Sequence, residues 1–274
     1  MGIGLKNARD IAGIWRSGQI TAKLHTELSR RVIAGVSTLE LDEFARGYIS
    51  KHGAYPTFLG YQVGNHAYPA ALCVSINEEI VHGIPSQRRL KPGDLVSVDL
   101  GVTLDGYISD AARTWYIGEN ASISQPPQGS NIARLCDATR RSLDAGIGAL
   151  KSGAHLRDVS CAIEAVLTDG KMGIVRELSG HGVGFQLHEE PTLYNYDTGR
   201  LGPLLQNGLV IAIEPMATLG STEILLAADE WTYCTADGSL AAHFEHTVVL
   251  WDDCAFVLTD EYDDDARQAF GAMQ

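Results

Sequence analysis

The sequence predicts an α+β protein, and three features of the chain lead to this class. Helical patterns occupy the beginning and the middle of the chain, strand patterns are concentrated after Gly170, and a long hairpin is encoded at 94–116. These elements interleave irregularly, whereas a doubly wound sheet needs strands and helices that alternate one by one. With 274 residues, the chain is long enough to bury a sizeable core in one domain.

The first two helices are predicted from apolar periodicity and from a capping sequence. Residues 7–34 carry apolar side chains at helical spacing. A second helix begins at Ser37, because in S-T-L-E the serine caps the first turn and Glu40 reaches back to the cap. This helix is expected to end near Gly53, and residues 58–90 are expected to form loops and short strands.

The hairpin and the elements after it complete the chain. Asp105-Gly106 is a two-residue turn between strands of alternating pattern. The stretch at 121–130 is a surface loop that precedes two further helices, at 131–153 and 156–170. The remaining strands are expected near 174–178, 209–217, 223–227, 231–235, 241–250 and 255–259. We expect a single domain over residues 1–274, with a short helical N-terminal extension (about 1–36) and an acidic, solvated C-terminal tail (about 260–274).

The composition excludes several classes of protein. Acidic residues outnumber basic ones by 34 to 21, and the resulting net charge of −13 disfavours partners such as nucleic acids and anionic membranes. The five cysteines are scattered and form no CxxC pair, which indicates a reducing compartment. The start has no secretory signal, and no apolar stretch is long enough to span a bilayer. We therefore expect a soluble, cytoplasmic protein.

The hairpin brings two carboxylates onto one face. A two-residue turn at 105–106 places Asp99 opposite Ala112 and Asp110 opposite Gly101. The two aspartates are then diagonal neighbours, with their α-carbons roughly 7–8 Å apart. Such a pair repels unless a cation lies between the carboxylates, although a solvated polar face is the alternative explanation.

Three more potential ligands follow the hairpin. His181 lies between glycines in SGHGVGFQLHEEP, where a simple turn is the alternative, and Glu214 and Glu245 interrupt apolar strand patterns, where an unpaired carboxylate would be costly. Four carboxylates carry a charge that two divalent ions would neutralise, and bridging carboxylates could hold such ions together. Because cysteine is missing from this set, Co, Mn, Fe(II) or Zn is favoured. The five candidate ligands are Asp99, Asp110, His181, Glu214 and Glu245.

At this point the chain resembles a known family. Five strings occur in the order and spacing typical of methionine aminopeptidases of type I, the bacterial-like class: NEEIVHGIP (77–85), GDLVSVDLGVTLDGYISDAA (93–112), SGHGVGFQLHEEP (179–191), IAIEPM (211–216) and FEHT (244–247). Any one string is common, but five together are specific. The resemblance implies one catalytic domain with the pita-bread (creatinase/aminopeptidase) fold. In this fold, two pseudo-symmetric α+β halves surround a central antiparallel sheet, with helices on the outside.

The resemblance also implies an activity and a role for each residue. It implies removal of the N-terminal methionine from newly made proteins when the second residue is small, by a monomer that takes peptide or nascent-chain N-termini as partners; ribosome contact stays open. Among the ligands, Asp110 and Glu245 would bridge two metals, Asp99 would serve one of them, and His181 and Glu214 the other. Glu214 would also act as the general base. His82 and His188 would contact substrate, and the methionine pocket would consist of Tyr68, Cys73, Leu187 and Trp231.

Some departures and alternatives bear on this interpretation. The Gln62–Asn65 stretch leaves the placement of Tyr61 open, and Phe185 stands where a basic residue is more usual in the family. The short interval between Glu214 and Glu245 leaves no room for the helical insertion of type II enzymes. The nearest alternative is a prolidase or Xaa-Pro aminopeptidase, which usually carries a separate N-terminal domain. A ligand-free binding protein of the same fold and a dinuclear phosphatase are the other two.

Overall fold

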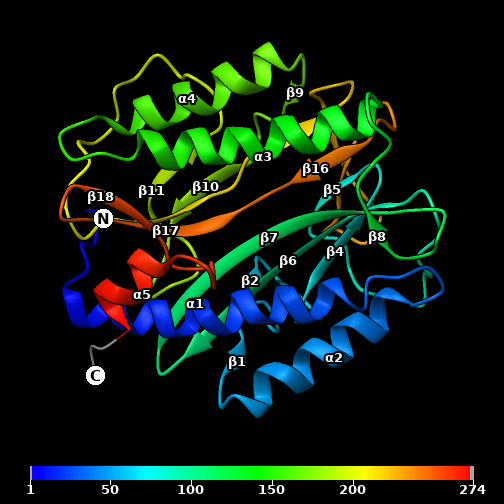
Figure 1. Cartoon of the computed structure of the whole chain (residues 1–274), viewed down its shortest axis with the longest axis horizontal. Helices are drawn as coiled ribbons and strands as arrows, with labels where there is room; N and C mark the ends of the chain where they lie inside the picture. Colours follow the sequence, from blue (N-terminus) through cyan, green and yellow to red (C-terminus); the bar gives the residue numbers. More distant parts are fainter. Residues whose placement is uncertain (1, 272–274) are drawn as a thin grey trace.

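The computed structural model of the chain describes residues 2–271. The strands lie between two layers of helices, with α3 and α4 on one side and α1 and α2 on the other (Figure 1). The shortest helix, α5, contacts α1 and β18. The described residues form the following helices: α1 (Ala8–Ser29), α2 (Thr38–Lys51), α3 (Asn131–Ala149), α4 (Leu156–Asp169) and α5 (Asp264–Phe270).

The strands form two five-stranded sheets and several smaller ones. One sheet has the order β1-β6-β7-β8 with β4 paired to β6, and the other has the order β11-β10-β12-β17-β18. The pairings within them are antiparallel. The strands are β1 (Tyr55–Pro56), β2 (Gln62–Val63), β3 (His66–Ala67), β4 (Cys73–Ile76), β5 (Glu79–Val81), β6 (Leu95–Leu104), β7 (Tyr107–Ile117), β8 (Ile123–Ser124), β9 (Gly173–Ile174), β10 (Ser179–Gly182), β11 (Glu189–Tyr194), β12 (Val210–Ile213), β13 (Met216–Thr218), β14 (Ile224–Leu226), β15 (Tyr233–Thr235), β16 (Ala241–His243), β17 (His246–Trp251) and β18 (Cys254–Val257).

The hairpin is confirmed residue by residue. Asp99 pairs with Ala112 and Gly101 with Asp110, as the two-residue turn requires. The opposite face of β6 is fully apolar and packs against α1 and α2 in one buried cluster. One face of this hairpin therefore belongs to the core, which leaves the aspartate face free for chemistry.

The helix starts are predicted well and the helix ends less well. Ser37 caps α2 in a capping box with Glu40, as expected. The first helix ends at Ser29 rather than at 34, because the chain turns at Arg30, whose N–H donates to the carbonyl oxygen of Leu28. The third and fourth helices also end slightly earlier than predicted, at Ala149 and Asp169.

The predicted helical N-terminal segment and the predicted solvated C-terminal tail both pack against the rest of the molecule. Helix α1 packs on β6 and β7, and a side chain at its Gly18 would lie 2.2 Å from the carbonyl oxygen of Leu258, so this glycine permits close packing. The acidic tail contains α5, whose Ala266 and Phe270 are buried, with the Phe270 ring against Phe256. Residues 272–274 of the predicted tail lie outside the described residues.

The second sheet has its own core. Helices α3 and α4 pack on each other and cover strands of this half, and together they enclose one large apolar cluster. All five cysteines are free. Within residues 2–271, none of the helices is long and apolar enough to cross a membrane.

Candidate metal centre

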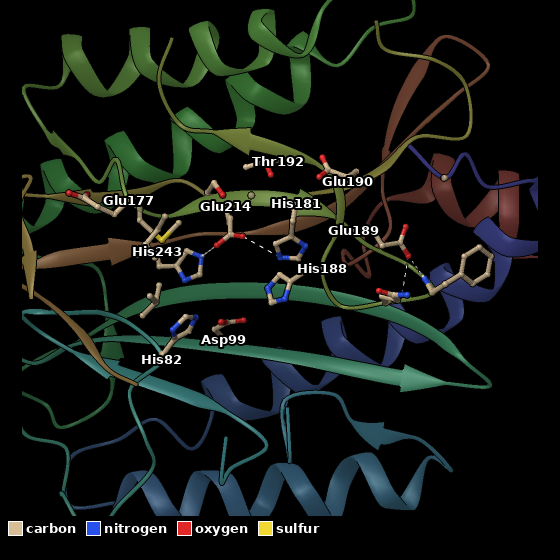
Figure 2. Close-up of a pocket in the computed structure, with 18 of the residues that line it drawn as sticks. His82, Asp99, Glu177, His181, His188, Glu189, Glu190, Thr192, Glu214 and His243 are labelled. Carbon is tan, nitrogen blue, oxygen red and sulfur yellow. Dashed lines mark hydrogen bonds and ion pairs between the residues drawn. The ribbon is translucent and has the colours of Figure 1, made fainter. Parts of the chain in front are cut away.

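The five predicted ligands come from both halves of the molecule. Asp99 and Asp110 lie on β6 and β7, and His181 lies on β10. Glu214 and Glu245 were expected inside strands, but Glu214 directly follows β12 and Glu245 directly precedes β17. Ligand atoms of Asp110, His181 and Glu245 all lie within 4.8 Å of one another. Figure 2 shows Asp99, His181 and Glu214 turned toward the same space.

Backbone and hydroxyl hydrogen bonds fix the hairpin against the second sheet. The backbone N–H of Glu245 donates to the carbonyl oxygen of Ala112 at 3.0 Å, directly beside the aspartate face. Thr247 on β17 receives a hydrogen bond from the N–H of Asp110 at 2.9 Å, and its hydroxyl donates to the carbonyl oxygen of Asp110 at 2.8 Å. The two halves are thus joined where their carboxylates meet.

His181 is oriented to offer a lone pair. Its Nδ1 lies 3.0 Å from the carbonyl oxygen of Gly182, so Nδ1 carries the proton and Nε2 is free. Nε2 lies 3.4 Å from Oε1 of Glu214. Burial lowers the pKa of His181 to about 3, so this imidazole is neutral, as a metal ligand must be.

The carboxylates lack a counter-charge from the protein. Burial raises the pKa of Asp99, Asp110, Glu214 and Glu245, and for Asp99 and Glu245 the neighbouring carboxylates raise it further. Buried oxygens of Asp99, Asp110 and Glu245 have no hydrogen-bond partner. Lys and Arg are absent from the residues that line the two cavities described below. Clustered oxygen donors without partners, together with one free imidazole nitrogen, fit a divalent cation.

The two predicted substrate-side histidines lie at this centre. His82 has a φ of 60°, an uncommon conformation for a residue with a side chain, and its pKa is lowered to about 4 by burial and by the nearby His188. The His188 ring lies 4.3 Å from the His181 ring, and its Nδ1 lies 2.6 Å from the hydroxyl of Tyr61. Tyr61, whose placement the sequence left open, therefore contacts the site.

A small cavity of about 110 Å³ opens on one side of the ligands. All four residues predicted for the methionine pocket line it: Tyr68, Cys73, Leu187 and Trp231. Its remaining apolar lining, which the sequence analysis did not assign to the pocket, includes Phe58 and Val63. The Tyr68 and Trp231 rings meet edge to face at 5.1 Å. The cavity is comparable in size to the ~150 Å³ sites that accept benzene in protein cores.

An open cleft of about 710 Å³ lies on the other side. Its lining is more polar and includes Glu177, Glu190 and Thr192, together with Gly2 and Gly4 from the start of the chain (Figure 2). The cleft and the small cavity share five residues: His82, Asp99, His181, His188 and Glu214. Three of the predicted ligands, Asp99, His181 and Glu214, therefore line both spaces, whereas Asp110 and Glu245 line the small cavity alone.

The loop between His181 and His188 is held by Glu189. Its Oε1 accepts hydrogen bonds from the N–H groups of Phe185 and Gln186, at 2.7 and 2.9 Å. Its Oε2 forms an ion pair with Lys6, a buried residue whose own N–H donates to Gly208 at 2.7 Å. A basic side chain is thus present here, but it comes from the N-terminal segment and not from position 185.

A further residue of this site, His243, is not among the residues predicted from the sequence. It lies on β16, is buried, and approaches the carboxylates of Glu214 and Glu245. The signal was present in AAHFEHT, because side chains two residues apart in an extended segment point the same way. His243 and Glu245 have this spacing.

Comparisons with known proteins agree with this geometry. Residues 12–252 match the model of metallopeptidase family M24. The chain is 40% identical to methionine aminopeptidase 1 of Bacillus subtilis, with 93% of this chain and 98% of that protein covered. It is 44% identical to methionine aminopeptidase 1 of Mycobacterium tuberculosis, with 93% and 94% covered.

Solved structures show the same fold. The structure of methionine aminopeptidase from Thermotoga maritima matches with a TM-score of 0.87 at 35% identity, covering 95% of this chain and all of that one. Prolidase from Pyrococcus furiosus matches with a TM-score of 0.72 at 20% identity, covering 93% of this chain but only 65% of that one, and shows the fold alone. The pita-bread fold expected from the sequence is confirmed.

Proposed function

The chain belongs to metallopeptidase family M24, and we propose that it is a methionine aminopeptidase that removes the N-terminal methionine from proteins whose second residue is small. One observation carries the proposal beyond the family resemblance. The candidate ligands line the small cavity, and three of them, Asp99, His181 and Glu214, also line the open cleft. A peptide can place its first side chain in the cavity and its remaining residues in the cleft, with the first peptide bond at the junction.

The small cavity suits methionine in shape and chemistry. Its aromatic rings, the Cys73 thiol and Leu187 are apolar and polarisable, and thioether–ring contacts contribute ~0.3–1.5 kcal/mol. A shorter side chain leaves part of the cavity empty, and an acidic one would meet the carboxylates that line the same cavity. The second residue lies between His82 and His188, so a large side chain there is expected to clash.

The site is a divalent-metal site, and we propose that it holds two ions, drawn from Co, Mn, Fe(II) or Zn. Asp110 and Glu245 would bridge the ions, Asp99 would bind one, and His181 and Glu214 would bind the other. The support is that Asp99, Asp110 and Glu245 offer buried carboxylate oxygens without hydrogen-bond partners, and that His181 offers a free imidazole nitrogen within 4.8 Å of oxygens of Asp110 and Glu245. When bound, the ions would activate the attacking water and polarise the scissile carbonyl.

The remaining steps fall to the side chains of the chain itself. Glu214 is proposed as the general base that accepts the proton of the attacking water and passes it to the departing amine, and burial and the charge of Asp110 raise its pKa above that of an ordinary glutamate. His188, held by Tyr61, is placed to donate to the carbonyl oxygen as negative charge develops on it. His82 is placed to hydrogen-bond the nitrogen of the scissile amide, and its neutral form fits this role.

We also propose the setting in which the enzyme works. It acts as a monomer on peptide or nascent-chain N-termini in the cytoplasm, and contact with the ribosome would deliver such ends. The acidic surface gives it no general affinity for nucleic acid or anionic membranes, in line with a net charge of −13. Sedimentation of the purified protein tests the monomer, and co-sedimentation with ribosomes at physiological salt tests the contact.

The experiment that tests the function compares two peptides under each candidate metal. We expect Met-Ala-Ser to be cleaved after its first residue and Ala-Pro-Ala to be left intact. The opposite preference would replace this proposal with the prolidase or Xaa-Pro aminopeptidase alternative. A second pair, Met-Ala-Ser and Met-Arg-Ser, tests the limit at the second residue, and equal rates would contradict it.

A further inference from the structure

We propose that His243 is a positioning residue of the metal centre, which donates a hydrogen bond from Nε2 to the carboxylate of Glu214 and fixes how that carboxylate is turned. The inference rests on the proposed function only in treating Glu214 as a metal ligand. It assigns a role to a residue outside the five ligands and the two substrate-side histidines.

The first observation is a buried ring nitrogen without a partner. His243 is 2% exposed, and its Nε2 is buried and makes no hydrogen bond. This atom lies 3.6 Å from Oε2 of Glu214 and 3.9 Å from Oε2 of Glu245. A movement of less than ~1 Å brings it to hydrogen-bond distance. Leaving a buried donor unpaired is costly, so a partner is expected, and the carboxylate oxygen of Glu214 is the closer acceptor.

The second observation is that Glu214 lies between two imidazoles. Its Oε1 faces Nε2 of His181 at 3.4 Å, and its Oε2 faces His243 (Figure 2). Since Nδ1 of His181 is already bonded to a carbonyl oxygen, Nε2 of His181 is an acceptor and cannot donate to Glu214. The Oε1 side is therefore the ligand side. A donor from His243 to Oε2 would keep the carboxylate from rotating away.

The third observation is that the backbone of His243 is held by two segments that carry metal ligands, the hairpin and the strand that follows Glu214. Its N–H donates to the hydroxyl of Thr114 on β7 at 2.9 Å, and that hydroxyl donates to the carbonyl oxygen of His243 at 2.7 Å. On its other side, His243 pairs with Met216, two residues after Glu214. The ring is thus held by the hairpin and by the segment that carries Glu214. Outer partners of this kind typically change metal affinity ~10–100-fold when removed.

The test measures metal binding and not peptide cleavage. Apo protein is titrated with Mn²⁺ by calorimetry for the wild type, His243→Phe and His243→Gln. Phenylalanine keeps the ring volume without a donor, and glutamine keeps an N–H donor without an imidazole. We expect Mn²⁺ binding ~10–100-fold weaker in His243→Phe and within ~3-fold of wild type in His243→Gln. Circular dichroism and thermal unfolding check that each variant is folded.

A second measurement needs no variant. In wild-type protein loaded with Zn²⁺, nitrogen NMR of the histidine rings is expected to show a proton on Nε2 of His243. The proposal is overturned if Nε2 is unprotonated and metal-bound, if His243→Phe keeps wild-type affinity, or if His243→Gln loses as much affinity as His243→Phe. Because none of these readouts uses a peptide, failure of the proposed function and failure of this inference are separate results.

Discussion

The small cavity and the open cleft share five residues but are built in different ways. The cavity, of about 110 Å³, is lined beside the metal ligands by apolar side chains, of which Tyr68, Cys73 and Leu187 are almost fully buried. The cleft, of about 710 Å³, is bordered by exposed carboxylates and by the N-terminal segment. A rigid apolar enclosure selects by size and shape, whereas a wide polar groove tolerates many side chains. Selectivity for the first residue should therefore be strict, and selectivity beyond the second residue loose.

The largest effect is expected at Asp110, which lines the small cavity. Asp110→Ala removes a proposed bridging carboxylate, so kcat/KM for Met-Ala-Ser should fall by more than the ~100-fold that loss of an outer partner can cost. The chain should still fold, because the register of the hairpin is set by its backbone and its apolar face. Near-normal turnover in metal-replete buffer, with a normal circular dichroism spectrum, would contradict the ligand assignment.

Substitution of His82 tests catalysis separately from metal binding. Loss of one donor to the reacting group typically costs ~10²–10³ in kcat, which we expect for His82→Ala. Its Mn²⁺ affinity should stay within a few-fold of wild type, because His82 is assigned to the substrate and not to the ions. Calorimetry that shows a lost metal site would instead make His82 a ligand.

The clustered carboxylates of the metal site should make the stability of the metal-free protein depend on pH. Burial raises the pKa of Asp110 to about 7 and raises the pKa of Glu214 and Glu245 as well, so the folded state binds more protons than the unfolded state. Their stabilising contribution is then present below about pH 4 and is lost as pH rises toward 7. In chelator, the free energy of unfolding attributable to Asp110 should fall by roughly 4 kcal/mol over this interval, since each pKa unit corresponds to about 1.4 kcal/mol.

Denaturant unfolding at several pH values measures this effect. Asp110→Asn is the matched control, because an amide does not titrate, and its profile should be flatter than that of wild type. Saturating Mn²⁺ should remove much of the loss, since the cation supplies the missing counter-charge. A wild-type profile identical with and without chelator would count against carboxylates that await a cation.

Features that depend on neighbouring residues in the chain are predicted from the sequence more directly than the methionine pocket is. The aspartate face of the hairpin follows from a two-residue turn and strict alternation, both of which are local rules, and its register is confirmed. Ser37 and Glu40 are predicted for the same reason, since a capping box spans one turn. The pocket residues Tyr68, Cys73, Leu187 and Trp231 came from family resemblance, because no local pattern joins segments so far apart in the chain.

What the sequence missed depends on contacts between distant segments. Lys6 forms an ion pair with Glu189, although the two residues are far apart in the sequence. No pattern near either residue predicts this contact. The sequence predicts continuous strands through Glu214 and Glu245, whereas in the structure the strands are interrupted at both residues. Apolar residues on both sides of each glutamate conceal so short an interruption. The tail was read as solvated from its acidic residues, although Phe270 packs against aromatic rings of the second half. Composition alone does not show which side chain finds a partner.

Leu187 and Phe185 are two residues apart in the chain, but one lines the cavity and the other the cleft. Substituting each in turn therefore compares the two spaces. Leu187 is buried in the cavity wall, whereas Phe185 is 52% exposed and borders the cleft. We expect Leu187→Ala to reduce the preference for Met-first over Ala-first peptides roughly 10-fold, since the enlarged cavity no longer fits methionine. Phe185→Ala should leave this preference within ~2-fold of wild type. Equal losses in both variants would mean that the cavity is not the methionine pocket.

The smallest effect is expected at Lys6, whose ion pair with Glu189 supports the wall of the open cleft. In Lys6→Met, Glu189 loses its ion pair but keeps the N–H groups of Phe185 and Gln186, so the loop is loosened rather than released. We expect KM for a Met-Ala-led hexapeptide to rise ~3–10-fold, with kcat and the cleavage of the dipeptide Met-Ala nearly unchanged, because only the longer peptide extends along the cleft. Lys23→Met, an exposed change on α1, is the matched control and should behave as wild type. Thermal unfolding must show Lys6→Met folded at the assay temperature, since breaking a buried ion pair can cost ~3–5 kcal/mol. Equal losses with dipeptide and hexapeptide would show that Lys6 acts through His188 or through the fold as a whole. The wall of the cleft that Lys6 supports would then have no separate role in binding longer peptides.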